Sequence, residues 1–130
     1  MASRIRAINA YRPRIKLGRT AQFDELVAHI ASRTSLNTGE IIMVLMELRD
    51  AVIFFNRDGR GVKLEGLGTY LPNMQLDGSF DVQHRLDRSI KRALNTREFW
   101  GTILNRKNVG KTPDELVAQW NVEHPDDPVT

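Results

Sequence analysis

Apolar residues recur at helical spacing in the segment that follows residue 20. Phe23, Leu26, Val27 and Ile30 occupy positions i, i+3, i+4 and i+7, which lie on one face of a helix. Asp24, Glu25, Ala28 and His29 fill the positions between them. The pattern predicts a helix that ends near Arg33.

A longer helix is predicted over residues 38–57, and it is apolar around most of its circumference. A surface helix of a monomer needs only one apolar face, so this helix must be buried on two sides. We therefore expect a homodimer, with the alternative that later segments of the same chain wrap a central helix. The expected dimer interface is the stripe Ile41, Leu45, Leu48, Val52 and Phe55, and a second, offset stripe contains Ile42, Met46 and Ile53.

The pattern changes to a period of two after residue 60. Val62 and Leu64 alternate with polar residues, as in a half-buried strand. The two glycines within residues 66–68 predict a bulge, a bend or a close approach of the backbone. Asp77-Gly78 is typical of a tight hairpin, and Phe80 begins the returning strand. We expect a small antiparallel sheet.

The two ends of the chain show weaker periodicity, apart from the helix predicted near the C-terminus. A short helix is expected to begin at Asp87 or Ser89, and a capping box with proline at its first helical position predicts a helix over residues 113–122. Residues 3–17 show no helical stripe, so residues 1–19 are expected to form a basic, extended arm. The predicted elements give an α+β fold with three parts: the N-terminal arm over residues 1–19, a domain over residues 20–94 and a C-terminal extension over residues 95–130.

Charge is distributed unevenly along the chain. The net charge of the 130 residues is +3, but residues 1–19 hold six basic side chains and no acid, whereas residues 112–130 hold five acids and no base. A second basic cluster lies within residues 85–92. Fourteen of the 19 cations are arginine, whose planar guanidinium suits phosphate better than lysine does. An anionic partner is expected; a solvated surface is the alternative.

No motif of a familiar enzyme is present. The chain has no cysteine, and its three histidines lack metal-ligand spacing. Gly110-Lys-Thr lacks the earlier glycine of a phosphate-binding loop. We expect no catalytic site, no cofactor and no metal. No apolar run is long enough to span a membrane, and the N-terminus does not resemble a secretory signal, so the expected location is the cytoplasm.

The stretch Val62-Lys-Leu-Glu-Gly-Leu-Gly-Thr-Tyr70 resembles the strand motif V-x-L-x-G-F-G-T-F of the HU/IHF family of histone-like DNA-binding proteins. The order of predicted elements is also that of the family, and Tyr11-Arg-Pro-Arg-Ile15 resembles the N-terminal extension of its divergent members. The resemblance covers about residues 11–94. It implies an intertwined homodimer that binds duplex DNA with little sequence preference through two β-ribbon arms, which bend the duplex.

The chain departs from the family in its arm. Only residues 71–80 separate the strands, without a basic residue or a proline at the tip. We therefore expect the body to contact DNA phosphates without intercalating arms, through ten cations: Arg4, Arg6, Arg12, Arg14, Lys16, Arg19, Arg85, Arg88, Lys91 and Arg92. The alternative is an HU-like protein-interaction or assembly module that has lost DNA binding, with residues 95–130 and their two tryptophans as the partner-binding part.

Overall fold

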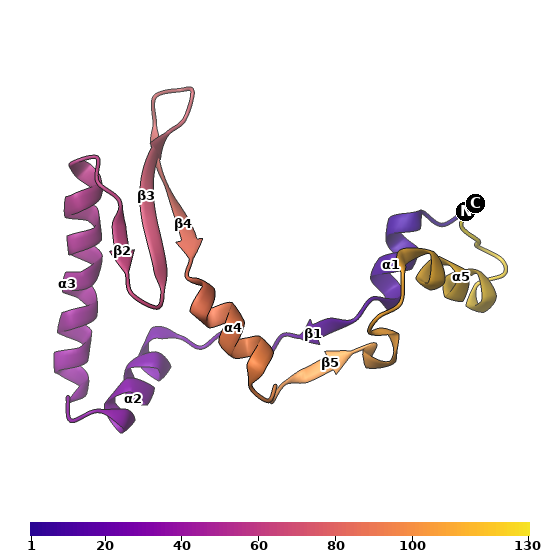
Figure 1. The fold of residues 1–130 in the computed structure, drawn as a ribbon, viewed down its shortest axis with the longest axis horizontal. Coiled ribbons are helices and arrows are strands. Elements are labelled where there is room, and N and C mark those ends of the chain that lie inside the picture. The colour runs from indigo at the N-terminus through magenta and orange to yellow at the C-terminus, as the bar shows by residue number, and fades with distance from the viewer. The chain divides into compact units, whose positions relative to one another are not determined.

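The computed structural model describes all 130 residues, and they form two compact units. The central unit comprises residues 20–99. The terminal unit comprises residues 1–19 together with residues 100–130, so both ends of the chain fold together (Figure 1). The predicted arm and the predicted C-terminal extension are therefore parts of one body.

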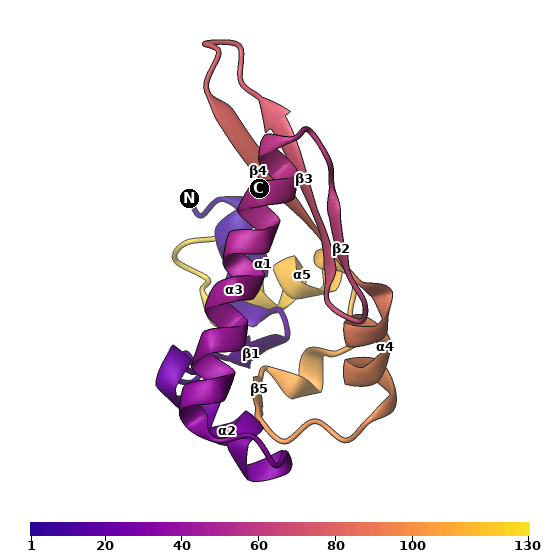
Figure 2. The same cartoon turned by 90° about the vertical axis from the view of Figure 1, so that its left-hand side faces the viewer.

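The central unit has the predicted α+β order. Its helices are α2 (Phe23–Arg33), α3 (Thr38–Arg57) and α4 (Arg88–Thr96), and its strands are β2 (Val62–Leu64), β3 (Gly68–Met74) and β4 (Phe80–Leu86). The strands form an antiparallel sheet in the order β2-β3-β4, and α3 packs against α2, β2 and β3. The β3–β4 hairpin continues past the end of α3 (Figures 1 and 2).

Local interactions explain the bounds of α3. The Asn37 side chain accepts a hydrogen bond from the backbone N–H of Glu40 at 2.8 Å and donates one to the Glu40 carboxylate at 2.9 Å. This reciprocal pair caps the helix N-terminus. The helix ends before Gly59, which has a φ of +75° and so adopts a conformation that favours glycine.

Gly68 brings β3 unusually close to β4. A Cβ atom at this position would lie 2.3 Å from the carbonyl oxygen of Arg85, and its φ is +149°. Only glycine fits both constraints. The close approach predicted from the glycines of residues 66–68 is thus confirmed at Gly68.

Few apolar side chains of the central unit are buried. Only Val27 and Ile41, each 3% exposed, are buried hydrophobic residues of the unit. Small domains already bury a limited share of their surface, and this unit of 80 residues leaves much of its apolar surface only partly covered.

A groove of about 580 Å³ lies between α3 and the β3–β4 hairpin. Val52 and Ile53 line it from α3, and apolar side chains of the hairpin line it from the other side: Tyr70, Pro72, Phe80 and Val82. It is an uncovered apolar surface beside a sparse core.

The terminal unit corrects the expectation of an extended arm. Residues Arg4–Tyr11 form helix α1, capped by the Ser3 side chain, which accepts a hydrogen bond from the Arg6 N–H at 3.1 Å. Only β1 (Arg14–Lys16) is extended, and it pairs antiparallel with β5 (Thr102–Leu104). A 3-10 helix, η1 (Arg106–Asn108), and helix α5 (Pro113–Glu123) complete the unit. The predicted α5 and its Thr112 cap are confirmed.

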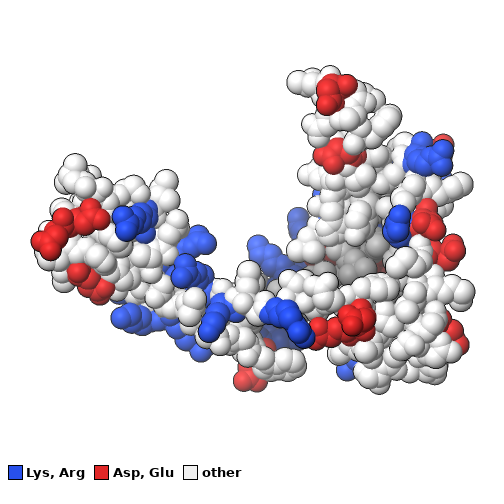
Figure 3. Space-filling view, turned by 180° about the vertical axis from the view of Figure 1, so that it is seen from behind, with Lys and Arg blue, Asp and Glu red and all other residues white.

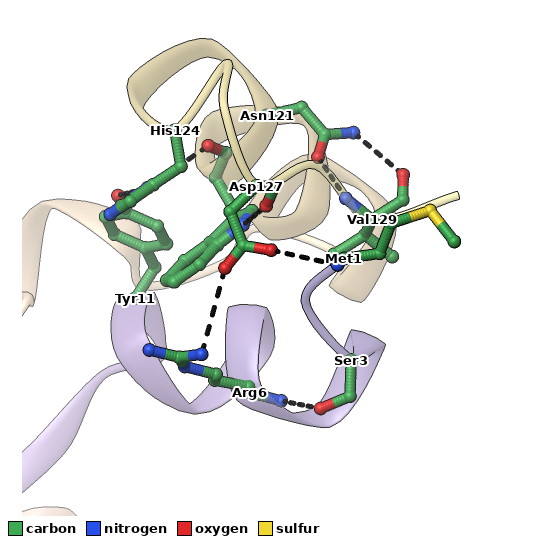
Figure 4. Close-up of polar contacts among 9 residues, drawn as sticks. Met1, Ser3, Arg6, Tyr11, Asn121, His124, Asp127 and Val129 are labelled. Carbon is green, nitrogen blue, oxygen red and sulfur yellow. Dashed lines mark hydrogen bonds and ion pairs between the residues drawn. The ribbon is translucent and has the colours of Figure 1, made fainter.

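The core of this unit forms around Trp120, which is 5% exposed and packs with Ala2 and Ala7. Its indole N–H donates to the carbonyl of Asp127 at 2.7 Å, and the His124 ring stacks on it at 3.7 Å (Figure 4). The tail folds back over α5, since the Asn121 side chain accepts from the Val129 N–H at 2.7 Å. Ala7 lies on the buried side of α1 because Trp120, supplied from the other end of the chain, covers it.

Candidate nucleic-acid interface

The basic cluster of the central unit lies at the end of β4 and along α4. Arg88, Lys91 and Arg92 are spaced i, i+3 and i+4, so they share one face of α4, and Arg85 precedes them on β4. All four side chains are exposed and none forms an ion pair with an acid of the chain. Such a face can hold several phosphates at once.

Asp87 fixes where this face begins. Its carboxylate caps α4 by accepting a hydrogen bond from the Ser89 N–H at 2.8 Å. Hydrogen bonds from Ser89 lower the pKa of Asp87, and the charges of Lys63 and Arg92 lower it further. The carboxylate therefore remains ionised at neutral pH and serves as a helix cap.

Two of the predicted DNA-binding cations are engaged within the chain. The Arg4 guanidinium pairs with Asp114 at 2.6 Å, and the Arg6 guanidinium lies 3.8 Å from the Asp127 carboxylate. Asp127 also lies 3.4 Å from the Met1 ammonium (Figure 4). The acidic tail thus neutralises the basic helix α1.

The other four predicted cations of the N-terminal segment remain exposed and without an ion pair: Arg12, Arg14, Lys16 and Arg19. Three more cations of the same unit, Arg106, Lys107 and Lys111, are also exposed and without an ion pair, and they were not among the predicted residues. They were missed because residues 95–111 carry no readable periodicity, although the basic residues themselves were visible in the sequence.

The two units differ in charge. The terminal unit has nine Lys and Arg against five Asp and Glu, whereas the central unit has ten against eleven, so their net charges are +4 and −1. In the terminal unit, Figure 3 shows Lys and Arg along one side and acids gathered at the far end. The excess positive charge of the protein therefore lies in the terminal unit.

The β3–β4 hairpin has none of the features of a cationic arm. Residues 71–84 contain no lysine or arginine, and the turn holds Asp77, whose pKa is lowered by hydrogen bonds from Ser79. The hairpin end exposes Met74, Leu76 and Phe80. This end is apolar and acidic.

The five residues predicted as the dimer interface lie on the covered side of α3. Ile41 is buried, and Leu45, Leu48, Val52 and Phe55 are half-buried within the chain itself. The uncovered face is the second stripe, in which Ile42 and Met46 are each 41% exposed and Ile53 is 44% exposed. The second stripe, which was not part of the predicted interface, is therefore the more exposed apolar surface of α3, and the predicted interface stays a prediction.

No three His, Asp or Glu side chains gather in an arrangement that could hold a metal ion. None of the helices combines the length and the apolar character needed to cross a bilayer.

Comparisons with known proteins give one match. Residues 6–95 match the HU-HIG family, described as an HU domain fused to a wHTH, Ig or glycine-rich motif. No curated protein and no solved structure matches the chain. The matched region contains the whole central sheet and α2 and α3, and it covers more than half of the 130 residues. The chain therefore belongs to the HU-HIG family of HU-like domain proteins.

Proposed function

We propose that this protein is a homodimeric, nucleoid-associated DNA-binding protein that contacts the phosphate backbone without reading sequence. The observation that carries the proposal is the exposed, unpaired basic face of α4 in an HU-like domain: Arg85, Arg88, Lys91 and Arg92. Contacts between arginine or lysine and phosphates position a protein on a duplex but carry no sequence information.

The short hairpin determines the expected mode of binding. Proteins that bend DNA strongly from the minor groove insert apolar wedges and approach the groove with cationic side chains. The hairpin here has exposed apolar residues but no cation over residues 71–84, and it carries Asp77 and Asp81. Negative charge near the tip opposes entry into a groove lined by phosphates. We therefore expect binding with little bending.

The dimer is supported by the sparse core of the central unit. The unit leaves much of its apolar surface only partly covered, and the groove and the second stripe of α3 offer apolar surface that a second copy of the chain would cover. A two-fold interface places the same stripe on both subunits, so the contact is self-complementary.

Duplex binding tests the proposal. Affinities for several unrelated duplexes of equal length should agree closely, and the triple variant R88A/K91A/R92A should weaken all of them alike. Curved, nicked and linear duplexes should bind with similar affinity if bending is weak. A loss confined to one sequence would contradict backbone binding, and a wild-type protein that binds no duplex at low salt would refute the function.

A second function is favoured by the apolar hairpin end. Met74, Leu76 and Phe80 are 62%, 110% and 82% exposed, and exposed apolar clusters mark protein interfaces. In this alternative the HU-like fold serves as an assembly module without nucleic acid. Affinity capture with and without nuclease separates the two proposed functions. A protein partner that stays bound after nuclease treatment, together with absent duplex binding, supports the assembly module.

A further inference from the structure

We propose that the terminal unit carries a second phosphate-binding surface, which we call the composite basic surface. It joins two segments from opposite ends of the chain and consists of Arg12, Arg14, Lys16, Arg106, Lys107 and Lys111. The inference rests on the proposed function, since its ligand is the backbone of duplex DNA. The C-terminal half of the surface lies outside residues 6–95, so it is not part of the matched HU domain.

Asn105 and Asn108 hold the two segments together. Asn105 is the one non-glycine residue with positive φ, at 57°, and its side-chain amide donates to the carbonyls of Ala10 and Arg12, each at 3.1 Å. Asn108 is 1% exposed and donates to the carbonyl of Tyr11 at 2.6 Å. Three successive carbonyls at the end of α1, which lack partners within the helix, are thereby satisfied from the C-terminal segment.

These bonds hold the segment Arg106–Asn108 against residues 10–12, which lie just before β1. Arg106 and Lys107 lie between the two asparagines in sequence, and Lys111 follows in a turn in which its backbone N–H donates to the Asn108 carbonyl at 3.1 Å. Asn108 is buried, so this segment cannot move away without exposing a polar group that has a partner only in the folded unit. The buried Asn108 therefore holds the backbone that carries Arg106 and Lys107 in a fixed position.

The β1–β5 pair orients the N-terminal half of the surface. Arg14 pairs with Leu104, Ile15 with Ile103, and Lys16 with Thr102. Alternate residues of a strand point to opposite faces, so the Arg14 and Lys16 side chains share one face of the ribbon. Two-stranded ribbons of this kind are narrow enough to approach a duplex groove.

The charges of this surface are free to meet a ligand. The Asp114 and Asp127 carboxylates pair with Arg4 and Arg6, not with the cations of this surface. Glu123 accepts a hydrogen bond from the Tyr11 hydroxyl, which lowers the pKa of Glu123. The charge of Lys107 lowers this pKa further, so the Glu123 carboxylate partly neutralises the charge of Lys107. The other five cations of the surface have no acid partner within the chain.

A polyanion fits this surface better than a small anion. The cations are exposed side chains drawn from a strand, a turn and a 3-10 helix, and such a spread engages successive phosphates of a backbone. The terminal unit is also joined covalently to the HU-like domain at both ends, near residues 19 and 100. A second phosphate-binding unit linked to the first raises the affinity for a long duplex through effective concentration.

The test measures duplex affinity of the full chain across a salt series. R106A/K111A removes two charges from the composite basic surface, and R33A/R97A removes two exposed cations without an ion pair elsewhere as the matched control. N105G keeps every charge and suits the positive φ, but it removes both bonds to α1. We expect the slope of log K against log salt to become shallower by about 2 for R106A/K111A, and by about 1 to 3 for N105G.

The controls separate the two proposals. Both tryptophans of the chain, Trp100 and Trp120, lie in the terminal unit, so their fluorescence reports whether each variant keeps this unit folded. Wild-type binding with the same slope in folded R106A/K111A would overturn the composite basic surface alone. A wild-type protein that binds no duplex would overturn the proposed function and this inference together. An equal loss in R33A/R97A would show a general charge effect and also overturn the inference.

Discussion

A charge placed on the uncovered stripe of α3 should separate the proposed dimer. The perturbation is Met46→Glu, because Met46 lies between Ile42 and Ile53 on the exposed face of the helix and is 41% exposed in the single chain. Met46→Leu is the matched control, since it keeps the site apolar and close in volume. The Met46→Glu dimer should dissociate, and the Met46→Leu dimer should not.

The expected size follows from the exposed fractions. Complete burial of an Ile, Met or Phe side chain contributes about 1.5–3 kcal/mol. Ile42 and Met46 are 41% exposed and Ile53 is 44% exposed, so covering the rest of each contributes about 0.6–1.3 kcal/mol. Phe54, 67% exposed, adds about 1–2 kcal/mol. In a two-fold dimer these four side chains together contribute about 6–12 kcal/mol.

Loss of Met46 alone from both subunits costs about 1.2–2.5 kcal/mol, which weakens the dimer about 10- to 60-fold. The two glutamates must also lose hydration at the interface, so this range is a lower bound. Because the central unit buries only Val27 and Ile41 by itself, dissociation should be accompanied by its unfolding.

Sedimentation and circular dichroism across a dilution series provide the assay. For wild type and Met46→Leu, the melting temperature should rise with protein concentration and the mass should be that of two chains. Met46→Glu should give one chain and a central unit that has lost its structure. A wild-type protein that sediments as one chain, with a melting temperature independent of concentration, would refute the two-sided burial of α3.

Three further predictions concern the rest of the molecule. Trp120→Ala should destabilise the terminal unit by about 3–5 kcal/mol while the central unit stays folded, as followed by circular dichroism and limited proteolysis; a joint loss of both units would contradict their independence. Gly68→Ala should destabilise the sheet by about 1–3 kcal/mol, measured by denaturant unfolding, because its Cβ meets a backbone carbonyl at 2.3 Å. The hydrogen bond between Tyr11 and Glu123 raises the pKa of Tyr11 from 10.0 to about 12 and lowers that of Glu123 below 4.5. The contribution of this hydrogen bond to the stability of the terminal unit is therefore complete between pH 4.5 and 10.0, and it is lost as the pH falls below or rises above this range. Tyr11→Phe should remove that pH dependence from the fluorescence-detected melting of the terminal unit, and an unchanged profile would argue against the contact.

The central unit was predictable because its signals are local and periodic. The helix predicted over 38–57 is α3, and the Asn37 side chain caps it. The family match over residues 6–95 agrees with the resemblance found in the motif Val62–Tyr70. What the pattern could not decide was which stripe of α3 the chain itself covers, since both have helical spacing.

The terminal unit was not predictable in the same way. Helix α1 has no apolar stripe of its own, and its buried side depends on Ala7 meeting Trp120 from the far end of the chain. Its C-terminal carbonyls find their partners in Asn105 and Asn108, about 95 residues away in sequence. Tertiary contacts of this range overrode the weak local preference, and they also brought Arg106 and Lys111 into the candidate site.

The most direct test of backbone binding is the affinity of the wild-type protein for a linear duplex as a function of salt. Each phosphate contact contributes about −0.9 to the slope of log K against log salt. Six or more contacts, drawn from the α4 face and the composite basic surface, predict a slope of about −5 or steeper. A slope near zero, or no binding in about 50 mM salt, would contradict DNA binding through the phosphate backbone.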